Sequence, residues 1–354
     1  MRLQLILAIG VMCPARTVLA DTSFTSKLQV YADNDHTQVV SPVVDAQADV
    51  HPGTTVTLGY IADAVTSASV DVVSQASSRT IHDTRHQVSG SISQDLGSLT
   101  VRGGYSYSRE NDYQSHTLSA GLQQELFDKN TTLALGYTLS LNTVGRVNDD
   151  VFSRGLTVNG LSASWTQVIS KRAITQVTYE LGHADGFQAS PYRFVPVRMS
   201  VDAAPEFAVP ETDPNIRWRH AIVVGANRAI GAGSIQGDYR LYRDTWGITS
   251  HTIGARYFIA LSPALELRLR HRFYVQNGAS FYRASYSTTS SYMTIDRELS
   301  PLWSETLGAK LAYAFTGHVE AEVKLDLFYY KYEDFPALAS RLGTNAGLGV
   351  TLTY

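Results

Sequence analysis

The sequence predicts an all-β fold: a single antiparallel transmembrane β-barrel of about 16 strands, within a range of about 14 to 18. Three observations lead to this prediction. Segments of about 9 to 12 residues with alternating apolar and polar side chains recur along the chain, the length that a tilted membrane-spanning strand requires. The connections between these segments alternate between tight turns and long loops. The chain ends on a segment of the same pattern whose last residue is aromatic.

Residues 1–20 have the features of a secretory signal peptide. Arg2 supplies the charged start, Leu3 to Met12 the apolar run, and Val18-Leu19-Ala20 the small-residue cleavage site. The only cysteine, Cys13, lies inside this segment, so the rest of the chain has no thiol for a disulfide or a metal. We therefore expect cleavage after Ala20 and a barrel domain over residues 21–354.

The charge of the chain argues against a nucleic-acid partner. The formal net charge is −3 at pH 7, and removal of Arg2 and Arg16 with the signal peptide makes it more negative. The ten histidines are scattered without the spacing of metal ligands, and the sequence has no glycine-rich phosphate-binding motif. We therefore expect no cofactor and no bound metal.

The alternating pattern is clearest in Val319 to Leu327, where apolar residues alternate with four charged ones. Residues 132–141 and 265–270 repeat it. A soluble sandwich would turn its apolar face inward, but the repetition in nearly every segment favours a barrel whose apolar face contacts lipid. Aromatic residues near the expected strand ends are typical of interfacial girdles, and these include Tyr105, Tyr107, Tyr257, Phe258, Phe328, Tyr329 and Tyr330.

The connections predict the topology. Bacterial outer-membrane barrels have short periplasmic turns and long outside loops. Strict alternation of the two kinds gives an even number of strands and places both termini in the periplasm. The sequence indicates tight turns at 51–54, 97–98, 128–130, 170–172, 231–233, 262–263 and 316–317, and long loops at 62–84, 143–155, 183–216, 277–303 and 331–341.

Two of these loops are candidates for modifying a pore. Residues 183–216 contain more apolar residues than a solvated loop needs, so we expect this loop to pack into the mouth or to fold inward as a constriction. Residues 62–84 are small, weakly polar and poor in turn residues, which suggests an inward-folded segment or a short helix along the lumen.

The polar face of the strands is expected to line the lumen. Its charges divide along the chain, and because chain order is also order around a barrel, we expect an acidic wall opposite a basic one. Such a transverse field favours hydrated polar solutes in a narrow pore. The alternative is that these charges form salt bridges that fill a closed barrel. The acidic wall comprises Asp33, Asp45, Asp49, Asp63 and Asp95, and the basic wall Arg217, Arg219, Arg240, Arg256, Arg268, Arg270, Arg272 and Lys310.

The C-terminal stretch Leu342 to Tyr354 is expected to close the barrel. Its apolar residues alternate with glycine and threonine. With Gly349, Leu352 and Tyr354 in register, it resembles the terminal signal by which bacterial outer-membrane barrels are recognised and inserted. The resemblance implies the barrel assembly machinery and outer-membrane lipid as partners. The last strand of a soluble sandwich is the alternative.

Catalysis is the competing class of function, because some outer-membrane barrels are hydrolases. A histidine beside a carboxylate can act as an oriented base, and the candidates are Asp35 with His36, His82 with Asp83, and His183 with Asp185. No serine shows the surroundings of an activated nucleophile. We therefore expect no enzyme activity and assign no catalytic residue.

A family resemblance begins at the first hairpins. Residues Tyr31 to Ser77, with Asp63 followed by Thr66-Ser67-Ala68-Ser69, are similar to the opening of a family of uncharacterised bacterial outer-membrane proteins known only as a domain of unknown function. That resemblance implies the fold and the location, and no activity. In size and architecture the chain also resembles porin-like barrels that work with periplasmic polysaccharide-export proteins.

Two transport functions fit these observations. The first is the outer-membrane conduit for a secreted polysaccharide, working with periplasmic export partners, in which Tyr31, Tyr242 and Tyr274 offer stacking surfaces for sugar rings. The second is a general diffusion porin for small polar solutes.

Overall fold

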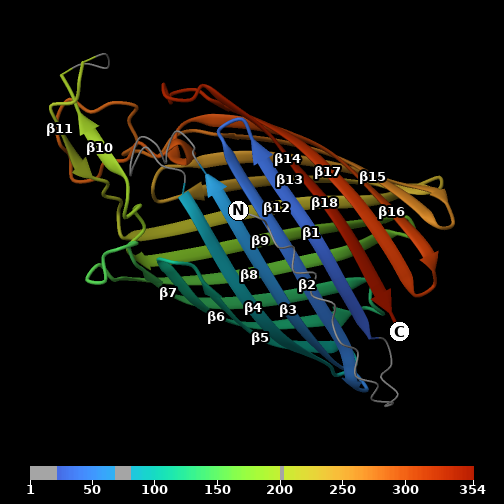
Figure 1. Ribbon diagram of the computed structural model, residues 1–354. Helices are drawn as coiled ribbons and strands as arrows, with labels where there is room; N and C mark the ends of the chain where they lie inside the picture. Colours follow the sequence, from blue (N-terminus) through green and yellow to red (C-terminus); the bar gives the residue numbers. More distant parts are fainter. Residues whose placement is uncertain (1–21, 68–80, 200–202) are drawn as a thin grey trace, which may run out of the picture.

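The computed structural model describes residues 22–67, 81–199 and 203–354. The described chain forms one closed antiparallel barrel of 16 strands and a separate two-stranded sheet (Figure 1). The predicted all-β barrel fold and its strand number are therefore confirmed. The predicted signal peptide over residues 1–20 lies outside the described residues, as does the centre of the expected loop 62–84. No helix within the described ranges is long and apolar enough to cross a membrane.

The strands follow one another around the barrel in chain order, and β1 closes it against β18. The separate sheet pairs β10 with β11, and one short 3₁₀ helix, η1, covers Arg297–Leu299. The strand bounds are β1 Ser23–Asp33, β2 Thr37–His51, β3 Thr54–Ser67, β4 Ile81–Asp95, β5 Leu99–Arg109, β6 Tyr113–Leu126, β7 Thr131–Val144, β8 Arg154–Ser170, β9 Ala173–Gly186, β10 Phe194–Val197, β11 Phe207–Pro210, β12 Ile216–Ile230, β13 Gly233–Asp244, β14 Thr249–Ser262, β15 Leu265–Gln276, β16 Leu302–Thr316, β17 Val319–Tyr332 and β18 Ser340–Thr353.

The connections at one end of the barrel, here called the turn end, are all short, whereas those at the other, here called the loop end, include the long loops and also short ones at 34–36 and 110–112. All seven tight turns lie where the sequence indicates them. Gly53, Gly97 and Gly231 adopt φ values of 75°, 90° and 57°, a left-handed backbone that glycine accepts without strain. Ser23 pairs with Thr353, so β1 begins and β18 ends together at the turn end. This agrees with the even strand count that the alternating connections predict.

The outer face of the barrel is apolar because alternate residues of each strand point outward. In β1 these are Phe24, Leu28 and Val30, each more than a third exposed, while the intervening residues point inward. On the neighbouring β18, Leu348 and Val350 lie opposite outward residues of β1 and are 59% and 44% exposed. Large apolar side chains exposed on such a scale indicate contact with lipid.

Connections at the loop end pack on one another. Val195 and Val197 of β10 are buried against Tyr286 and Met293 of the loop between β15 and β16. Figure 1 shows β10 and β11 projecting beyond the ends of the barrel strands. For this hairpin, the inward-folded constriction expected from the sequence is therefore wrong. The loop is also shorter than the expected residues 183–216, since β9 continues to Gly186.

Ion pairs and hydrogen bonds link these loops around the mouth. Arg193 pairs with Glu211 at 3.0 Å within its own loop and with Asp296 of the loop between β15 and β16 at 2.9 Å. Arg297 pairs with Asp35 in the turn between β1 and β2. Charges buried in this way stay stable only when each has its partner. The loop end is therefore a connected layer rather than a set of independent loops.

Candidate functional site

The inner face of the barrel is the candidate site, and its basic side chains come from neighbouring strands. Arg256 of β14 lies directly opposite Arg270 of β15, and Arg268 lies opposite Lys310 of β16. Arg240 of β13, Arg256, Arg270 and Arg272 line a hollow of about 330 Å³ on this face. All eight residues of the predicted basic wall share the inward side of β12 to β16.

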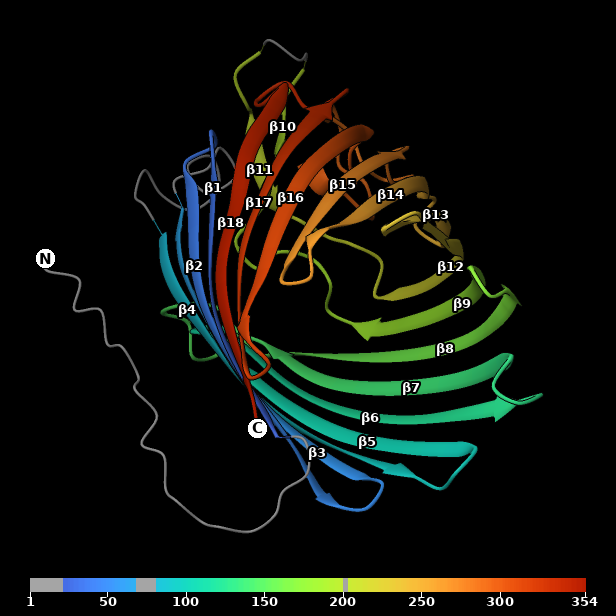
Figure 2. The same cartoon turned by 90° about the vertical axis from the view of Figure 1, so that its right-hand side faces the viewer.

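The opposite side of the barrel offers hydroxyl groups and glycines. Figure 2 shows β5 to β9 curving around one side and β12 to β18 around the other. Thr117 and Ser140 share a hydrogen bond of 2.8 Å across β6 and β7, and Ser162 lies against Gly136. A surface of this kind can accept and donate hydrogen bonds to the hydroxyls of a sugar. Its inward residues include Ser89, Ser91, Ser106, Thr117, Ser119, Thr138, Ser140, Ser162, Ser164 and Thr166.

Acidic residues are interleaved with the arginines. The sequence analysis predicted the arginines but missed these acids. Arg240 pairs with Glu180 at 3.2 Å, and Arg256 with Asp238 at 3.6 Å. The alternation could have revealed them, because Asp238 and Arg240 stand two residues apart on one strand and therefore share a face. The remaining pairs are Arg217 with Asp244, Arg270 with Asp326, Lys324 with Asp326, and Lys310 with Glu322.

This mixture of acidic and basic side chains changes the electric field expected across the lumen. The arginine side keeps an excess of positive charge, because Arg219, Arg268 and Arg272 have no carboxylate partner among the described residues. The sharp division into an acidic wall and a basic wall is therefore wrong. The inner face has instead a basic side with embedded acids and a hydroxyl-rich side that carries few charged residues, such as Arg102 and Glu125.

The predicted acidic wall also divides into different roles. The carboxylate of Asp33 accepts hydrogen bonds of 3.0 Å from the backbone N–H groups of the next turn, and Asp95 accepts one of 2.8 Å from Gly97. These two carboxylates hold turns at opposite ends of the barrel. Their assignment to a charged wall of the lumen is therefore wrong. Asp63 pairs with Arg85 at 2.5 Å.

Two predicted wall residues keep an inward place between β2 and β3. Asp49 accepts a hydrogen bond of 2.6 Å from the Thr55 hydroxyl. Asp45 lies beside Gly59, where an added methyl group would stand 2.8 Å from its carboxylate. The inner face near β2 therefore carries less free negative charge than the sequence suggested.

The three predicted stacking tyrosines lie on the inner face near the loop end. Tyr31 stacks on Phe328 with ring centroids 5.3 Å apart, so one face of its ring is covered. Tyr242 donates a hydrogen bond of 2.7 Å to Asp244, and Tyr274 donates one to Gln276. Guanidinium groups of neighbouring arginines lie 5.2 Å from the rings of Tyr242 and Tyr274. Their rings are thus held in place by the residues around them.

The terminal strand places the three residues of the predicted insertion signal on two faces. Gly349 lies on the inner face between Lys27 and Glu322, whose side chains meet over it at 2.8 Å. Leu352 lies opposite Phe24 on the outer face, and Tyr354 is 57% exposed. Gly349 therefore has a packing role as well, because a side chain there would collide with the ion pair.

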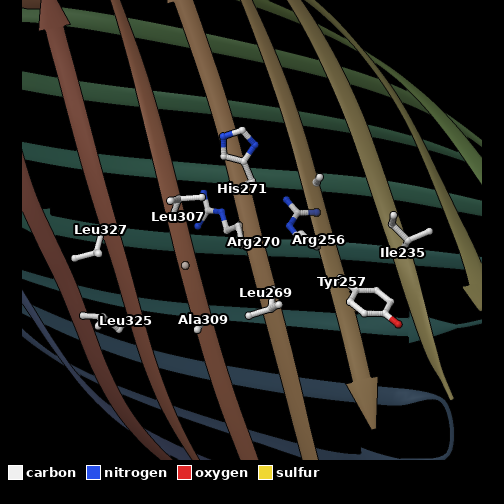
Figure 3. A pocket seen from close by; sticks show the side chains of 12 residues that line it. Ile235, Arg256, Tyr257, Leu269, Arg270, His271, Leu307, Ala309, Leu325 and Leu327 are labelled. Carbon is white, nitrogen blue, oxygen red and sulfur yellow. The ribbon is translucent and has the colours of Figure 1, made fainter. Parts of the chain in front are cut away.

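A further hollow, of about 530 Å³, lies among apolar residues of the outer face. Figure 3 shows Leu269, Leu307 and Leu325 on three neighbouring strands, with Tyr257 beside them. These side chains point away from the lumen and are between 38% and 58% exposed. This groove faces lipid and is not part of the candidate transport path.

The predicted histidine–carboxylate pairs have other surroundings. Asp35 is buried on Arg297, and the His183 ring packs on Trp218 with centroids 4.2 Å apart. Asp83 accepts a hydrogen bond of 2.6 Å from Asn111, while the side chain of His82 lies outside the described part of the chain. Asp83, Glu110 and Asp112 offer oxygens within 4.8 Å of one another at the loop end, where a cation could bind.

Comparison with protein families identifies the chain. The model of a family described as "Protein of unknown function (DUF3570)" matches residues 71–159 and 153–350. The chain belongs to this family. The resemblance to a family of unknown function is thus confirmed, although the motif that suggested it, residues 31–77, lies mostly before the matched range. No curated protein matches the chain.

Two solved structures of similar fold have a TM-score above 0.5. A "Bacterial polysaccharide outer membrane secretin" is 9% identical, with a TM-score of 0.54, and the match covers 94% of this chain and 98% of that one. CdiB from Acinetobacter baumannii is 8% identical with the same TM-score, and the match covers 94% of this chain and 60% of CdiB. At such identities the likeness concerns the fold alone.

Proposed function

We propose that the protein is an integral outer-membrane channel that serves as the conduit for a secreted polysaccharide. The observation that carries the proposal is the composition of the inner face, where a hydroxyl-rich side faces an arginine-rich side. Sugar hydroxyls can exchange hydrogen bonds with the first, and acidic or polar substituents can bind the second. The likeness in fold to a polysaccharide secretin over nearly the whole of both chains supports the same function.

In this function the turn end faces the periplasm and the loop end faces outside, as in other bacterial barrels. The short turns would then meet periplasmic export partners, and they carry exposed cations such as Lys129, Lys171 and Arg172. The polymer would enter there, pass the arginines, and leave between the linked loops. Tyr31, Tyr242 and Tyr274 would contact sugar rings near the exit.

A general diffusion porin is the second candidate. The unpaired guanidinium groups of Arg219, Arg268 and Arg272 favour it, since they would attract small anions into a water-filled lumen. The two functions predict different effects of deleting the gene. Loss of a conduit stops secretion of its polysaccharide, whereas loss of a porin leaves secretion intact.

The test is a deletion of the gene in the producing bacterium, with quantification of every secreted and surface polysaccharide. The conduit function predicts that one polymer falls to background and is restored by the wild-type gene. Restoration should fail with Arg268, Arg270 and Arg272 all changed to Ser, provided that this variant reaches the membrane folded. Wild-type amounts of every polysaccharide in the deletion strain would contradict the conduit and leave the porin.

A further inference from the structure

A partial ring of hydrogen-bonded tyrosine pairs, here called the ring, lies on the outer face of the barrel from β3 to β14. In each pair, the tyrosine hydroxyl of one strand contacts a histidine or an asparagine of the next strand across a loop-end hairpin. The pairs with histidine Nδ1 are Tyr60 with His86 at 2.8 Å, Tyr105 with His116 at 2.7 Å, Tyr179 with His220 at 2.7 Å and Tyr239 with His251 at 2.6 Å, and Tyr137 contacts Asn159 at 2.7 Å.

The five pairs lie at one depth. Each tyrosine stands six residues after the first residue of its strand, counted from the turn end. Six residues at ~3.3 Å each, tilted by about 40°, place the tyrosine about 15 Å above the turn end, with its partner slightly farther. Beyond the tyrosines the outward residues are mixed: Leu141 and Ile216 are apolar and exposed, whereas Arg109 and Arg243, ten residues after the first residue of their strands, are charged. By the same measure these two arginines lie about 25 Å above the turn end, the height of the apolar band in such barrels, so they lie at the boundary between hydrocarbon and lipid head groups on the loop side.

Two of the pairs have an arginine beside them. His86 lies directly opposite Arg109 across β4 and β5, and His220 lies directly opposite Arg243 across β12 and β13. Side chains in such positions start about 5 Å apart. Neither guanidinium forms an ion pair within the described residues.

Each of these pairs also keeps a donor for a third group. If the tyrosine donates to Nδ1, the histidine keeps its Nε2–H, and if the histidine donates, the tyrosine keeps its O–H. An arginine and a neighbouring N–H or O–H donor suit a phosphate oxygen. Below the two pairs, toward the turn end, exposed Leu58 and Val88 or Ile222 and Val224 provide a surface for acyl chains.

We propose that Tyr60, His86 and Arg109 form one binding site, and Tyr179, His220 and Arg243 a second, for a membrane lipid with an anionic phosphate head group. The sites lie on the outer face and do not depend on what the lumen transports. They would fix the barrel at a defined depth in the leaflet at the loop end.

The chain contains its own control. His116 faces Tyr105 in the same ring, but its Nε2 lies 2.9 Å from the Gln114 amide nitrogen, and Leu141 lies opposite it on β7. If the amide donates to Nε2, His116 donates its Nδ1–H to Tyr105, which keeps its own O–H, so this pair differs from the other two in having no arginine directly opposite its histidine. It should not bind the lipid.

The experiment is native mass spectrometry of the folded protein, released from detergent with added phosphatidylglycerol or with an uncharged galactosyl diacylglycerol. The wild type should retain one phosphatidylglycerol per site. The variant R109Q/R243Q should retain about tenfold less, R109K/R243K should keep most of the binding, and H116F should match the wild type. Folding of each variant is checked by heat-dependent migration on a gel.

Equal retention of phosphatidylglycerol by R109Q/R243Q and the wild type would overturn the proposal. Retention of the galactosyl lipid as strong as that of phosphatidylglycerol would overturn it too, because no phosphate would then be recognised. Should the double variant fail to fold, the single variants R109Q and R243Q decide, each losing one of the two bound lipids.

Discussion

Asp326 of β17 reaches Arg270 of β15 across the strand between them, because the residue that separates the two is Gly308 of β16. Arg270 lies opposite Gly308, and Gly308 lies opposite Asp326. The ion pair, at 3.5 Å, passes over the glycine where any side chain would collide with the carboxylate. Lys27 and Glu322 meet over Gly349 in the same way. Two glycines of the inner face thus make room for ion pairs that tie together alternate strands.

Gly308→Ala should destabilise the barrel. The added methyl group forces Asp326 to move and breaks its contact with Arg270, which we expect to cost about 1 to 3 kcal/mol. The measurement is the free energy of unfolding in urea, with the protein in lipid vesicles. Gly103→Ala is the control, because nothing lies within 4 Å of its added carbon, and it should change the value by less than about 0.5 kcal/mol. Equal effects of the two changes would argue against the ion-pair role of Gly308.

Asp326→Asn should shift ion selectivity toward anions. The change removes a carboxylate that compensates both Arg270 and Lys324 on the inner face. We expect the anion-to-cation permeability ratio to rise by roughly twofold. The measurement is the reversal potential in a salt gradient. Asp128→Asn, in a turn outside the lumen, should leave that potential unchanged, and a shift in the opposite direction for Asp326→Asn would contradict its inward position.

Arg193→Met should loosen the loop end and leave the barrel intact. Glu211 has a side chain only 1% exposed, and it loses its guanidinium partner, a change that costs about 3 to 5 kcal/mol for a buried pair. Limited proteolysis should cut residues 187–215 faster while heat-dependent migration of the barrel is unchanged. Arg172→Met, in an exposed turn, is the control. Unchanged cleavage in Arg193→Met would mean that the apolar cluster around Val195 holds the loop alone.

Asp213→Asn should stabilise the loop before β12 at high pH. Burial and the nearby carboxylates of Glu211 and Asp296 raise the pKa of Asp213 to about 7. An unfolded aspartate titrates near 4, so the folded form binds the extra proton and the free energy of loop opening falls as pH rises from about 4 to 7. Asn does not titrate, so the free energy of loop opening in Asp213→Asn does not fall over this pH range.

Hydrogen exchange of residues 204–215 measures that difference. The variant should be more protected than the wild type at pH 8, by up to about 4 kcal/mol, and nearly equal to it at pH 4. A difference that grows toward low pH would have the wrong sign and would exclude the raised pKa.

The fold could be predicted because its signals are local. Alternation sets the face of each residue, as for Leu348 and Val350, and glycines such as Gly53 mark tight turns. The same alternation placed Arg268, Arg270 and Arg272 on one face. It also places Asp326 on the same face as Lys324, because the two residues are two positions apart on one strand.

Other features depend on contacts that no local pattern encodes. The alternation gives the face on which a residue lies but not the partner of its carboxylate. Asp33 and Asp95, which hold turns, could therefore not be distinguished from residues that face the lumen. Arg193 and Asp296 stand far apart in the chain, and their pairing follows from the packing of two loops. The projecting hairpin of β10 and β11 likewise depends on its partner loop.

Single-channel conductance in a planar bilayer tests the central claim, that the inner face lines an open hydrophilic path. The wild-type barrel and a variant with Arg268, Arg270 and Arg272 changed to Ser are compared in the same salt gradient. The account predicts a steady open conductance whose selectivity moves toward cations in the variant. Absence of conductance in the folded wild type, or equal selectivity of the two proteins, would contradict it.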